Sequence, residues 1–351
     1  MQTQKISWAD NIRFFATVGV VLLHASAPGI YKFGKISDFD WGFLNIVDSA
    51  TRCCVPLFVM LSGALLLRQD KELLPYLKNR FWRVLVPFLF WALVYCLVYI
   101  ANIWNTTDWK NLFDNLTDTL KDIVFFRAEF KRQAFHLWYV YMILGLYLVV
   151  PIIRKWIKNA TEKEIIYFLI LWVITLFIGS NSSKFFYPNI QLTFFSGYLG
   201  YFVLGYYLSM KNFELSPFLN KTLGIICLFL IIATSVGTYF LSKQKGALDE
   251  TLFEYLSPNI VLLSATVFLW FKTVKISKTP LNKWISLGAQ YSFGIYLVHR
   301  MIMNTLSYWG LDWTFIHPTV GVPLTTVVSF IVSLGIIYFL QKIPGGKRIS
   351  G

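Results

Sequence analysis

The sequence predicts an all-α protein: a bundle of helices that crosses a membrane several times. Of its 351 residues, 56% are hydrophobic and only 14% are charged, and the mean hydropathy is +0.56. This balance lies outside the range of ordinary soluble domains. The apolar residues also gather in runs of about 17 to 25, the length that a helix needs to cross the hydrocarbon core. A polytopic membrane protein is therefore expected.

About ten such runs follow one another along the chain, and each is expected to form one membrane-spanning helix. They lie near residues 12–30, 45–67, 84–104, 136–153, 164–180, 190–210, 222–241, 256–271, 285–308 and 319–340. The long polar connection 105–135 alternates acidic and aromatic residues, which predicts an extracytoplasmic loop with a short amphipathic helix on the membrane surface. Residues 1–351 are expected to form a single membrane domain with no fused soluble domain.

The charged residues predict the orientation of the bundle. The chain has 32 basic and 18 acidic side chains, for a net charge of +14. Most basic residues fall in every second connection, and most acidic residues fall in the connections between them. Because cytoplasmic loops are enriched in Lys and Arg, both termini are expected in the cytoplasm. Topology thus accounts for the positive charge, and nucleic acid is not expected as a partner.

Three ionisable residues interrupt the first apolar run, where charge is expensive. Arg13 and His24 are eleven residues apart, which in a helix is about three turns and roughly 16 Å, so both project from nearly the same face. Asp10 lies one turn before Arg13, close enough to pair with its guanidinium. We expect a stripe of Asp10, Arg13 and His24 on one helix, with His24 near the bilayer centre.

Two other histidines, His136 and His299, begin the fourth run and lie in the outer half of the ninth. Histidine exchanges protons near neutral pH, so an enzyme in the membrane would use it as a general base or to bind substrate. The alternative for both is a structural histidine that hydrogen-bonds a neighbouring helix. The chain's four cysteines show no metal-ligand spacing, so no metal is expected.

A basic cluster, Lys78, Arg80 and Arg83, precedes the helix predicted to start near Pro87. Together with Arg13 it would meet a polyanion at the cytoplasmic face, such as a phosphate-rich donor. The alternative is simple positive-inside retention, which explains most clusters of this kind.

Arg52 is a different case, because it lies inside the second run with Asp48 one turn before it. A charged residue at this depth is a candidate for substrate binding. Asp48 is its expected partner. The alternative is a structural ion pair between helices, and the residues alone favour neither.

These residues resemble the signature of the acyltransferase-3 family of membrane acyltransferases, in which an arginine, ten residues and a histidine occupy the first span. Arg13 and His24 have that spacing. The further matches are DNIR at 10–13, SATRCCVPLFVMLSG at 49–63, the pattern R-x-x-R-x-L-x-P at 80–87, HLWY at 136–139 and SFGIYLVH at 292–299. Each motif alone is weak, but together and in this order they are specific.

The resemblance implies an enzyme of the bacterial cytoplasmic (inner) membrane that draws an acetyl group from cytoplasmic acetyl-CoA and delivers it to a sugar hydroxyl. Within the family the chain is most similar to stand-alone surface-polysaccharide O-acetyltransferases of the enterobacterial common antigen type. Many members carry a fused extracytoplasmic esterase-like domain, which this sequence lacks. Either the acceptor glycan then reaches the membrane site directly, or a separate polysaccharide-biosynthesis protein completes the delivery.

The mechanism that follows places acetyl-CoA at the cytoplasmic mouth, with its phosphates on Arg13 and on the cluster of Lys78, Arg80 and Arg83. Its thioester then reaches toward His24, which acts as general base or as acyl carrier. The remaining candidates, expected to bind the acceptor or steady an oxyanion, are Arg52, His136, Tyr291 and His299. Acetyl-CoA is the only co-substrate expected, and the bilayer and a glycan are the expected partners.

A rival hypothesis is a transporter that exports a polysaccharide intermediate or a small molecule. In that case Arg13, His24 and Arg52 would line a substrate or proton path. A purely structural membrane protein is a third possibility, but it does not explain buried charge on one helix face.

Overall fold

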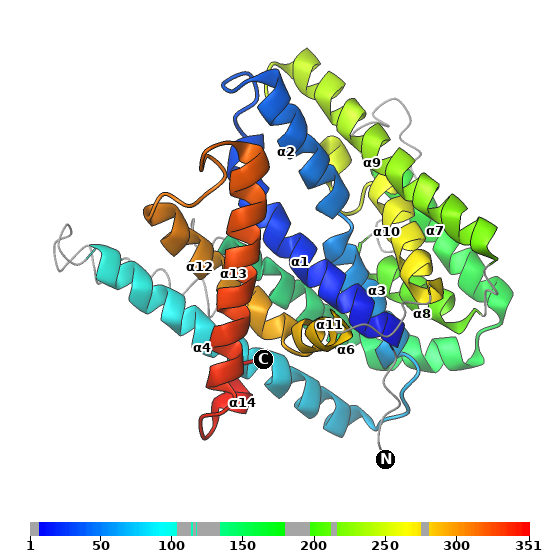
Figure 1. The fold of residues 1–351 in the computed structure, drawn as a ribbon. Helices are drawn as coiled ribbons and strands as arrows, with labels where there is room; N and C mark the ends of the chain where they lie inside the picture. Colours follow the sequence, from blue (N-terminus) through cyan, green and yellow to red (C-terminus); the bar gives the residue numbers. More distant parts are fainter. Residues whose placement is uncertain are drawn as a thin grey trace.

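Helices joined by turns make up the described part of the chain, which comprises residues 7–103, 134–179, 197–211, 216–274 and 281–351 together with Asp114 and Thr117 in the computed structural model. No strand occurs among these residues. The helices pack side by side around α1 (Figure 1). The predicted all-α bundle is confirmed, whereas most of the predicted loop 105–135 lies outside the described residues.

The helices follow one another closely, with short 3-10 turns (η) before α6 and α10. Their bounds are α1 Ser7–Ile30, α2 Asp38–Thr51, α3 Cys54–Leu66, α4 Leu73–Ile103, η1 Phe135–Leu137, α6 Trp138–Asn159, α7 Glu162–Gly179, α8 Leu199–Met210, α9 Pro217–Lys245, η4 Thr251–Phe253, α10 Pro258–Thr273, α11 Leu281–Gln290, α12 Ser292–Tyr308, α13 Pro318–Leu340 and α14 Gly346–Ile349.

Seven segments of the described chain are long and apolar enough to cross a membrane: α1, α2 with α3, α4, η1 with α6, α9, η4 with α10, and α13. The three other predicted spans correspond to α7, α8 and α12. Helix α7 has 18 residues but three charges in its first turn, and α8 and α12 have 12 and 17 residues. The structure thus supports a multi-pass membrane protein, and the count of ten spans stays a prediction.

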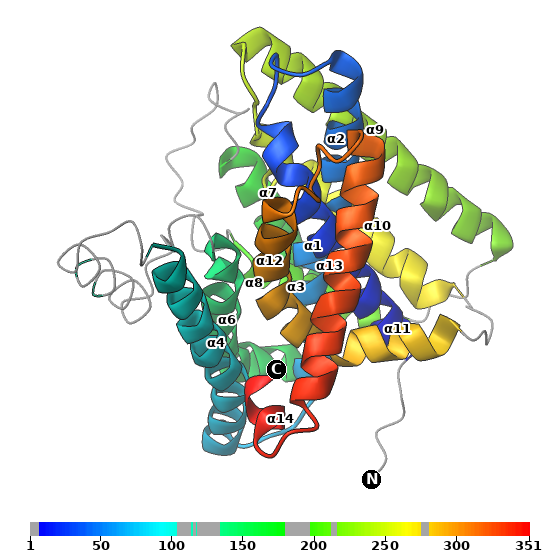
Figure 2. The same ribbon diagram turned by 60° about the vertical axis from the view of Figure 1, so that its left-hand side comes forward.

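Two predicted spans are broken. The run 285–308, expected as one helix, is α11 followed by α12, which meet at Tyr291 and point in different directions (Figure 2). The run 45–67 is interrupted at Arg52 and Cys53, between α2 and α3. Hydropathy averaged over a long window does not reveal such breaks, because apolar segments lie on both sides of each junction.

Helix α1 lies at the centre because small and apolar residues recur on one face. Ala9, Ile12, Ala16 and Val20 are all at most 4% exposed, and their spacing of three to four residues places them in one stripe. The helix contacts α2, α3, α10, α11, α12 and α13. The stripe therefore holds Arg13 and His24 inside the bundle.

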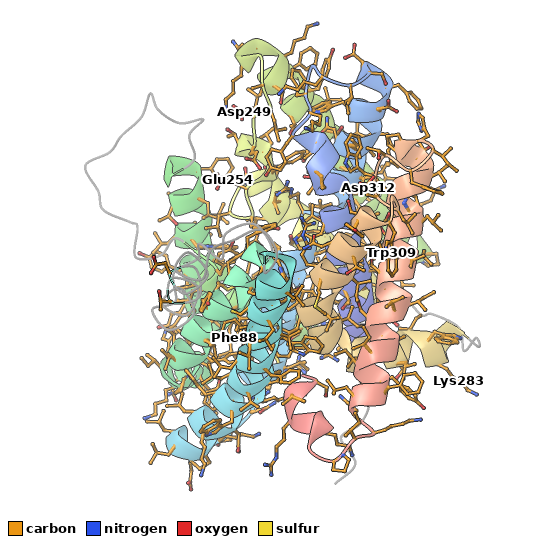
Figure 3. All side chains as sticks on the ribbon, turned by 90° about the vertical axis from the view of Figure 1, so that its left-hand side faces the viewer. Phe88, Asp249, Glu254, Lys283, Trp309 and Asp312 are labelled. Atoms are coloured by element: carbon orange, nitrogen blue, oxygen red, sulfur yellow. The ribbon has the colours of Figure 1, made fainter. Side chains whose placement is uncertain are left out.

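The two ends of the bundle carry opposite charge. At the basic end, α1 and α4 begin and α14 lies (Figure 1), and Lys283 projects there (Figure 3). At the acidic end, α2 begins and α9 ends, and Figure 3 places Asp249, Glu254 and Asp312 toward it. This segregation is what the positive-inside rule expects of a protein with its basic end in the cytoplasm. The orientation of the termini stays a prediction.

Candidate active site

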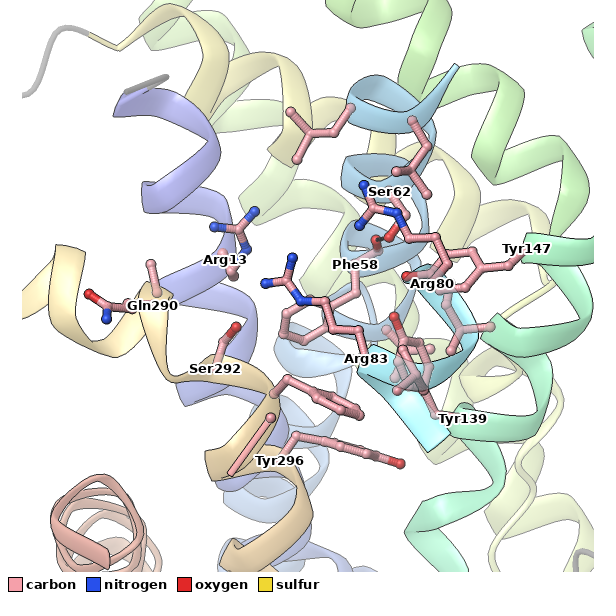
Figure 4. Close-up of a pocket in the computed structure, with 18 of the residues that line it drawn as sticks. Arg13, Phe58, Ser62, Arg80, Arg83, Tyr139, Tyr147, Gln290, Ser292 and Tyr296 are labelled. Atoms are coloured by element: carbon pink, nitrogen blue, oxygen red, sulfur yellow. Dashed lines mark hydrogen bonds between the residues drawn. The ribbon is translucent and has the colours of Figure 1, made fainter. Parts of the chain in front are cut away.

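A cavity of about 480 Å³ lies between α1, α3, α4, α6 and α12. Its lining includes three guanidinium groups, those of Arg13, Arg80 and Arg83, which point into the same space (Figure 4). Among the described residues that line it, none is Asp or Glu. We call it the arginine cavity. Its volume is in the range of small-molecule sites, and its charge suits a ligand with several negative charges.

Two of the three arginines have hydrogen-bond partners, which lie on different parts of the chain. Arg13 donates through Nη1 to Oδ1 of Asp10 at 3.2 Å, so the predicted pairing is confirmed. Arg80 donates through Nη2 to Oε1 of Gln69 at 3.4 Å. Lys78, which the sequence groups with the arginines, is exposed and does not line the cavity. The reason is helical geometry: position 78 lies about 200° around the helix from position 80.

The three histidines of the predicted spans meet beyond this cavity. His24 comes from α1, His136 from η1 and His299 from α12. Their ring centroids lie 5.0 Å apart for His24 and His299, 5.2 Å for His136 and His299, and 5.9 Å for His24 and His136. His136 and His299 are 1% and 0% exposed. In the described part of the chain, no group of three or more His, Cys, Asp or Glu is arranged to hold a metal.

Hydrogen bonds within this histidine cluster assign the tautomers. Nδ1 of His299 lies 2.7 Å from the carbonyl oxygen of Tyr296 and 3.1 Å from that of Ile295, and since carbonyls only accept, Nδ1 carries the hydrogen. In a neutral imidazole the other nitrogen is then an acceptor. Nε2 of His299 lies 2.8 Å from Nδ1 of His24, which therefore donates. Nε2 of His24 therefore carries no hydrogen, and its lone pair can accept a proton.

Tyrosines tie the helices around the cluster. The hydroxyl of Tyr296 donates to the backbone carbonyl of His136. The hydroxyl of Tyr95, on α4, donates to the carbonyl of Leu297 and accepts from the backbone N–H of Met301, both at 3.1 Å. These bonds hold η1, α4 and α12 together, so the positions of the rings depend on three separate elements.

The arginine cavity ends one turn short of the histidines. Val20, four residues before His24 on α1, lines the cavity, and so does Tyr296, three residues before His299 on α12. His24 and His299 themselves do not line it. A ligand in the cavity would thus have its charged part among the arginines and its inner end against the turn that precedes the histidines.

A second pocket, of about 250 Å³, lies toward the acidic end. Its lining is Arg52, Tyr198, Glu250, Phe253, Glu254, Tyr255 and Leu256. Arg52 donates from both Nε, at 3.0 Å, and Nη2 to Oδ2 of Asp48, which is 0% exposed. Asp48 also accepts from Oγ of Ser26 at 3.4 Å. We call this the acidic-end pocket, and the predicted Arg52–Asp48 pair is confirmed in its wall.

Tyr31 holds one carboxylate of this pocket. Its hydroxyl donates to Oε1 of Glu250 at 2.8 Å. Burial, followed by this hydrogen bond, raises the pKa of Tyr31 to about 12. The phenol therefore stays a donor at physiological pH, and Glu250 has a defined place beside the pocket.

Tyr291 lines neither pocket, although its chain neighbours Gln290 and Ser292 line the arginine cavity. It caps α12 at the junction with α11, and its ring packs 6.3 Å from that of Tyr338 on α13. The structure does not bring it together with the other predicted site residues.

A family model described as an acyltransferase domain matches residues 6–340. The chain belongs to the acyltransferase-3 family. The match covers nearly the whole chain, so the histidine cluster, the acidic-end pocket and every lining residue of the arginine cavity except Gly351 lie within it. The family resemblance of the sequence motifs is confirmed.

Curated relatives of this acyltransferase-3 chain include two proteins of Staphylococcus aureus, each named "Probable poly-beta-1,6-N-acetyl-D-glucosamine export protein". The protein of strain MRSA252 is 24% identical and that of strain MSSA476 is 25% identical. Each match spans 322 residues, or 87% of this chain and 84% of the relative. No solved structure matches the chain. The finer resemblance to the enterobacterial common antigen type stays a prediction.

Two residues of the acyltransferase-3 site lie outside the predicted set. Tyr296 lines the arginine cavity and bonds to His136. Arg300 points Nη1 at the carbonyl oxygen of His24, at 3.4 Å, with its guanidinium 5.9 Å from the ring centre of Phe135. A charge inside an apolar run could have singled out Arg300. Tyr296 is one of 19 tyrosines, and only its place in the motif SFGIYLVH could have singled it out.

Proposed function

We propose that the protein is a membrane O-acetyltransferase that moves an acetyl group from acetyl-CoA to a hydroxyl of a cell-surface polysaccharide or its lipid-linked precursor. One observation carries the proposal. In a member of an acyltransferase family, a cavity lined by three arginines ends one turn short of a hydrogen-bonded pair of histidines, of which His299 is fully buried and His24 partly buried. A phosphate-rich thioester fits the cavity, and transfer of its acyl group fits the histidines.

The donor binds at the basic end, which we place in the cytoplasm. Arg13, Arg80 and Arg83 hold its phosphates through charge-assisted hydrogen bonds. The distance along α1 from Arg13 to His24 is roughly 16 Å, which the extended pantetheine arm of CoA spans. Lys78, which is exposed outside the cavity, has no part in this binding.

Nε2 of His24 acts as the base. It takes the proton from the acceptor hydroxyl while the hydroxyl oxygen attacks the thioester carbonyl carbon. The C–O bond forms, the C–S bond breaks, and the thiolate of CoA leaves and takes up the proton that His24 has accepted. His299 orients the ring throughout by accepting the hydrogen bond from Nδ1 of His24. An acetylated His24 would use the same nitrogen.

The acceptor belongs to the polysaccharides. The relatives of the chain are named for the export of an N-acetylglucosamine polymer, and the acidic-end pocket lies on the side from which such a glycan would approach. An O-acetyl group on a surface glycan is therefore the product that we expect.

The test uses purified protein in detergent, labelled acetyl-CoA and a glycan acceptor. We expect His24→Ala to lower the rate of transfer by about 100-fold or more, since general-base catalysis contributes that much. The matched control is His317→Asn. His317 is a partly exposed histidine that caps α13, with Nε2 2.8 Å from Oδ1 of Asp40, and it lines neither pocket. Asn keeps a capping oxygen. A folded His24→Ala protein with unchanged turnover would contradict the proposal.

A second candidate, export, is favoured by the names of the relatives. In that case proteoliposomes would move an N-acetylglucosamine oligosaccharide across the bilayer without consuming acetyl-CoA. The acetyltransferase predicts the reverse: acetyl-CoA is consumed, and the oligosaccharide gains one acetyl group by mass spectrometry. The two functions thus differ in a single vesicle experiment.

A further inference from the structure

The acidic-end pocket has the make-up of a carbohydrate site. Tyr198 and Tyr255 contribute aromatic side chains to its wall. Trp138 packs against both tyrosines. Its ring stacks on that of Tyr255, with centroids 5.7 Å apart and planes at 28°, and its centroid lies 5.9 Å from that of Tyr198. Flat aromatic faces bind the apolar C–H face of a sugar ring, and the hydroxyls at the ring edge then need polar partners.

Such polar partners surround the aromatic wall. Arg52 is fixed by Asp48 on one side and by the ring of Phe253, 4.5 Å from its guanidinium carbon, on the other. Glu250 is held by Tyr31, and Glu254 is exposed at the pocket. Carboxylates and a fixed guanidinium accept and donate hydrogen bonds in defined directions. A structural role for the Arg52–Asp48 pair accounts for Arg52 but for neither glutamate.

The pocket is joined to the histidine cluster at two points. Trp138 follows His136 by two residues, at the start of α6. Asp48, which holds Arg52, accepts a hydrogen bond from Ser26, two residues after His24 on α1. The walls of the pocket therefore contact the same elements, α1 and the start of α6, that carry His24 or directly follow His136.

The charge of the pocket is negative. The positive charge of Arg52 is offset by Asp48, which leaves the carboxylates of Glu250 and Glu254 without a compensating cation in the lining. A ligand with its own carboxylate or phosphate would be repelled, and like-charge repulsion of this kind is a common source of specificity.

We propose that the acidic-end pocket binds a sugar ring of the acceptor glycan, and that it selects neutral or amine-bearing sugars over acidic ones. The stacking surface is Tyr198 and Tyr255, backed by Trp138, and the charge filter is Glu250 and Glu254. This inference rests on the proposed acetyltransferase function for its place in the reaction, but binding of the sugar can be measured without any transfer.

Direct binding is the first test, by calorimetry on the full-length protein in detergent. The probes are a tetramer of N-acetylglucosamine, its de-N-acetylated form and a tetramer of galacturonic acid. We expect the first two to bind more tightly than the third. Tyr198→Ala should lower the affinity for the neutral tetramer about tenfold, which corresponds to about 1.4 kcal/mol. Tyr198→Phe should keep the affinity of the unaltered protein, because the aromatic ring remains.

The charge filter has its own matched pair of variants. Glu254→Gln should narrow the difference in affinity between the acidic and the neutral tetramer. Glu72→Gln, which changes an exposed glutamate just before α4 at the basic end, should leave that difference unchanged. Equal binding of all three tetramers by the unaltered protein, or no binding of the neutral and amine-bearing ones, would overturn the proposal.

Kinetics separate this inference from the proposed function. Tyr198→Ala should raise the KM for the neutral tetramer about tenfold, in line with the expected loss of affinity for that tetramer. The KM for acetyl-CoA should stay unchanged. If the unaltered protein binds the tetramer but never consumes acetyl-CoA, the acetyltransferase proposal fails and the sugar pocket stands. If it transfers acetyl groups while Tyr198→Ala changes neither affinity nor KM for the tetramer, the sugar pocket fails alone.

Discussion

Two backbone carbonyls, those of Ile295 and Tyr296, determine which nitrogen of His24 is available for chemistry. They accept from Nδ1 of His299, which leaves Nε2 of His299 to accept from His24. In the proposed mechanism His299 is thus a positioning residue. It lines neither the arginine cavity nor the acidic-end pocket, yet it accepts the hydrogen bond from the His24 nitrogen opposite Nε2, as the third member of a catalytic triad orients its histidine.

Substituting His299 tests this role. His299→Leu should lower kcat about 100-fold, a loss in the range of general-base effects, with little change in the KM for acetyl-CoA. His299→Gln should recover part of kcat, because its amide oxygen can accept the hydrogen bond from His24. Equal activity of the two variants in steady-state kinetics, at equal folded protein, would argue for a merely structural histidine.

The arginine cavity gives a matched pair of basic substitutions on α4. Arg83→Ala removes a guanidinium that lines the cavity, whereas Lys78→Ala removes an exposed cation nearby in sequence. Because a hydrogen bond to a charged group contributes about 1.5–3 kcal/mol, Arg83→Ala should raise the KM for acetyl-CoA at least tenfold. Lys78→Ala should leave it unchanged. Titration of acetyl-CoA against the initial rate measures both, and equal effects would contradict the assigned donor site.

Local spacing is what made part of the site predictable. Asp10, Arg13 and His24 share one helix, so helical periodicity alone places them on one face. The contact between His24 and His299 joins residues 275 positions apart, and no local pattern encodes it. The same limit applies to Lys78, which shares the charge of Arg80 and Arg83 but not their face of the helix.

At the level of elements, glycines let α3 and α8 approach with their backbones nearly in contact. A Cβ added to Gly63 would lie 1.8 Å from the carbonyl oxygen of Phe202, and one added to Gly205 would lie 2.0 Å from that of Met60. Backbone atoms cannot move aside as a flexible side chain can. Small residues at helix interfaces serve this purpose in membrane proteins.

Gly63→Ala should therefore destabilise the fold by about 1–3 kcal/mol or more, as overpacking does. The control is Gly145→Ala on α6, where an added Cβ meets no atom within 4 Å. Thermal unfolding in detergent should show a clear fall in Tm for Gly63→Ala and none for the control. A Tm that is unchanged in both variants would contradict the close approach of the two helices.

Apolar runs predicted where the helices lie but not where they break. The run 285–308 reads as one span, yet α11 ends at Gln290 and α12 begins at Ser292. Three residues near this break, Ala289, Gln290 and Ser292, line the arginine cavity, so the break helps to form the site. Average hydropathy over a window of about 19 residues does not resolve a change of direction over two residues.

On the scale of the whole molecule, charge divides the bundle into two ends, and this division is testable as topology. Cysteine introduced as Gln244→Cys, near the end of α9, should react with an impermeant maleimide added outside intact cells. Lys283→Cys, on α11 at the other end, should react only after permeabilisation. Both positions are exposed, and the native cysteines are buried. The opposite pattern would reverse the orientation and with it the side on which the donor binds.

The proposed transfer passes an acetyl group through the membrane, and an enzyme that does so must not dissipate the ion gradients across it. Val20 and Tyr296 line the arginine cavity one turn before the histidines, and an apolar and an aromatic side chain there disfavour a continuous chain of water. In the proposed transfer the thioester has to pass these two side chains, whereas a hydrated ion needs a continuous wet path. The protein would thus transfer a group between compartments without conducting ions across the membrane.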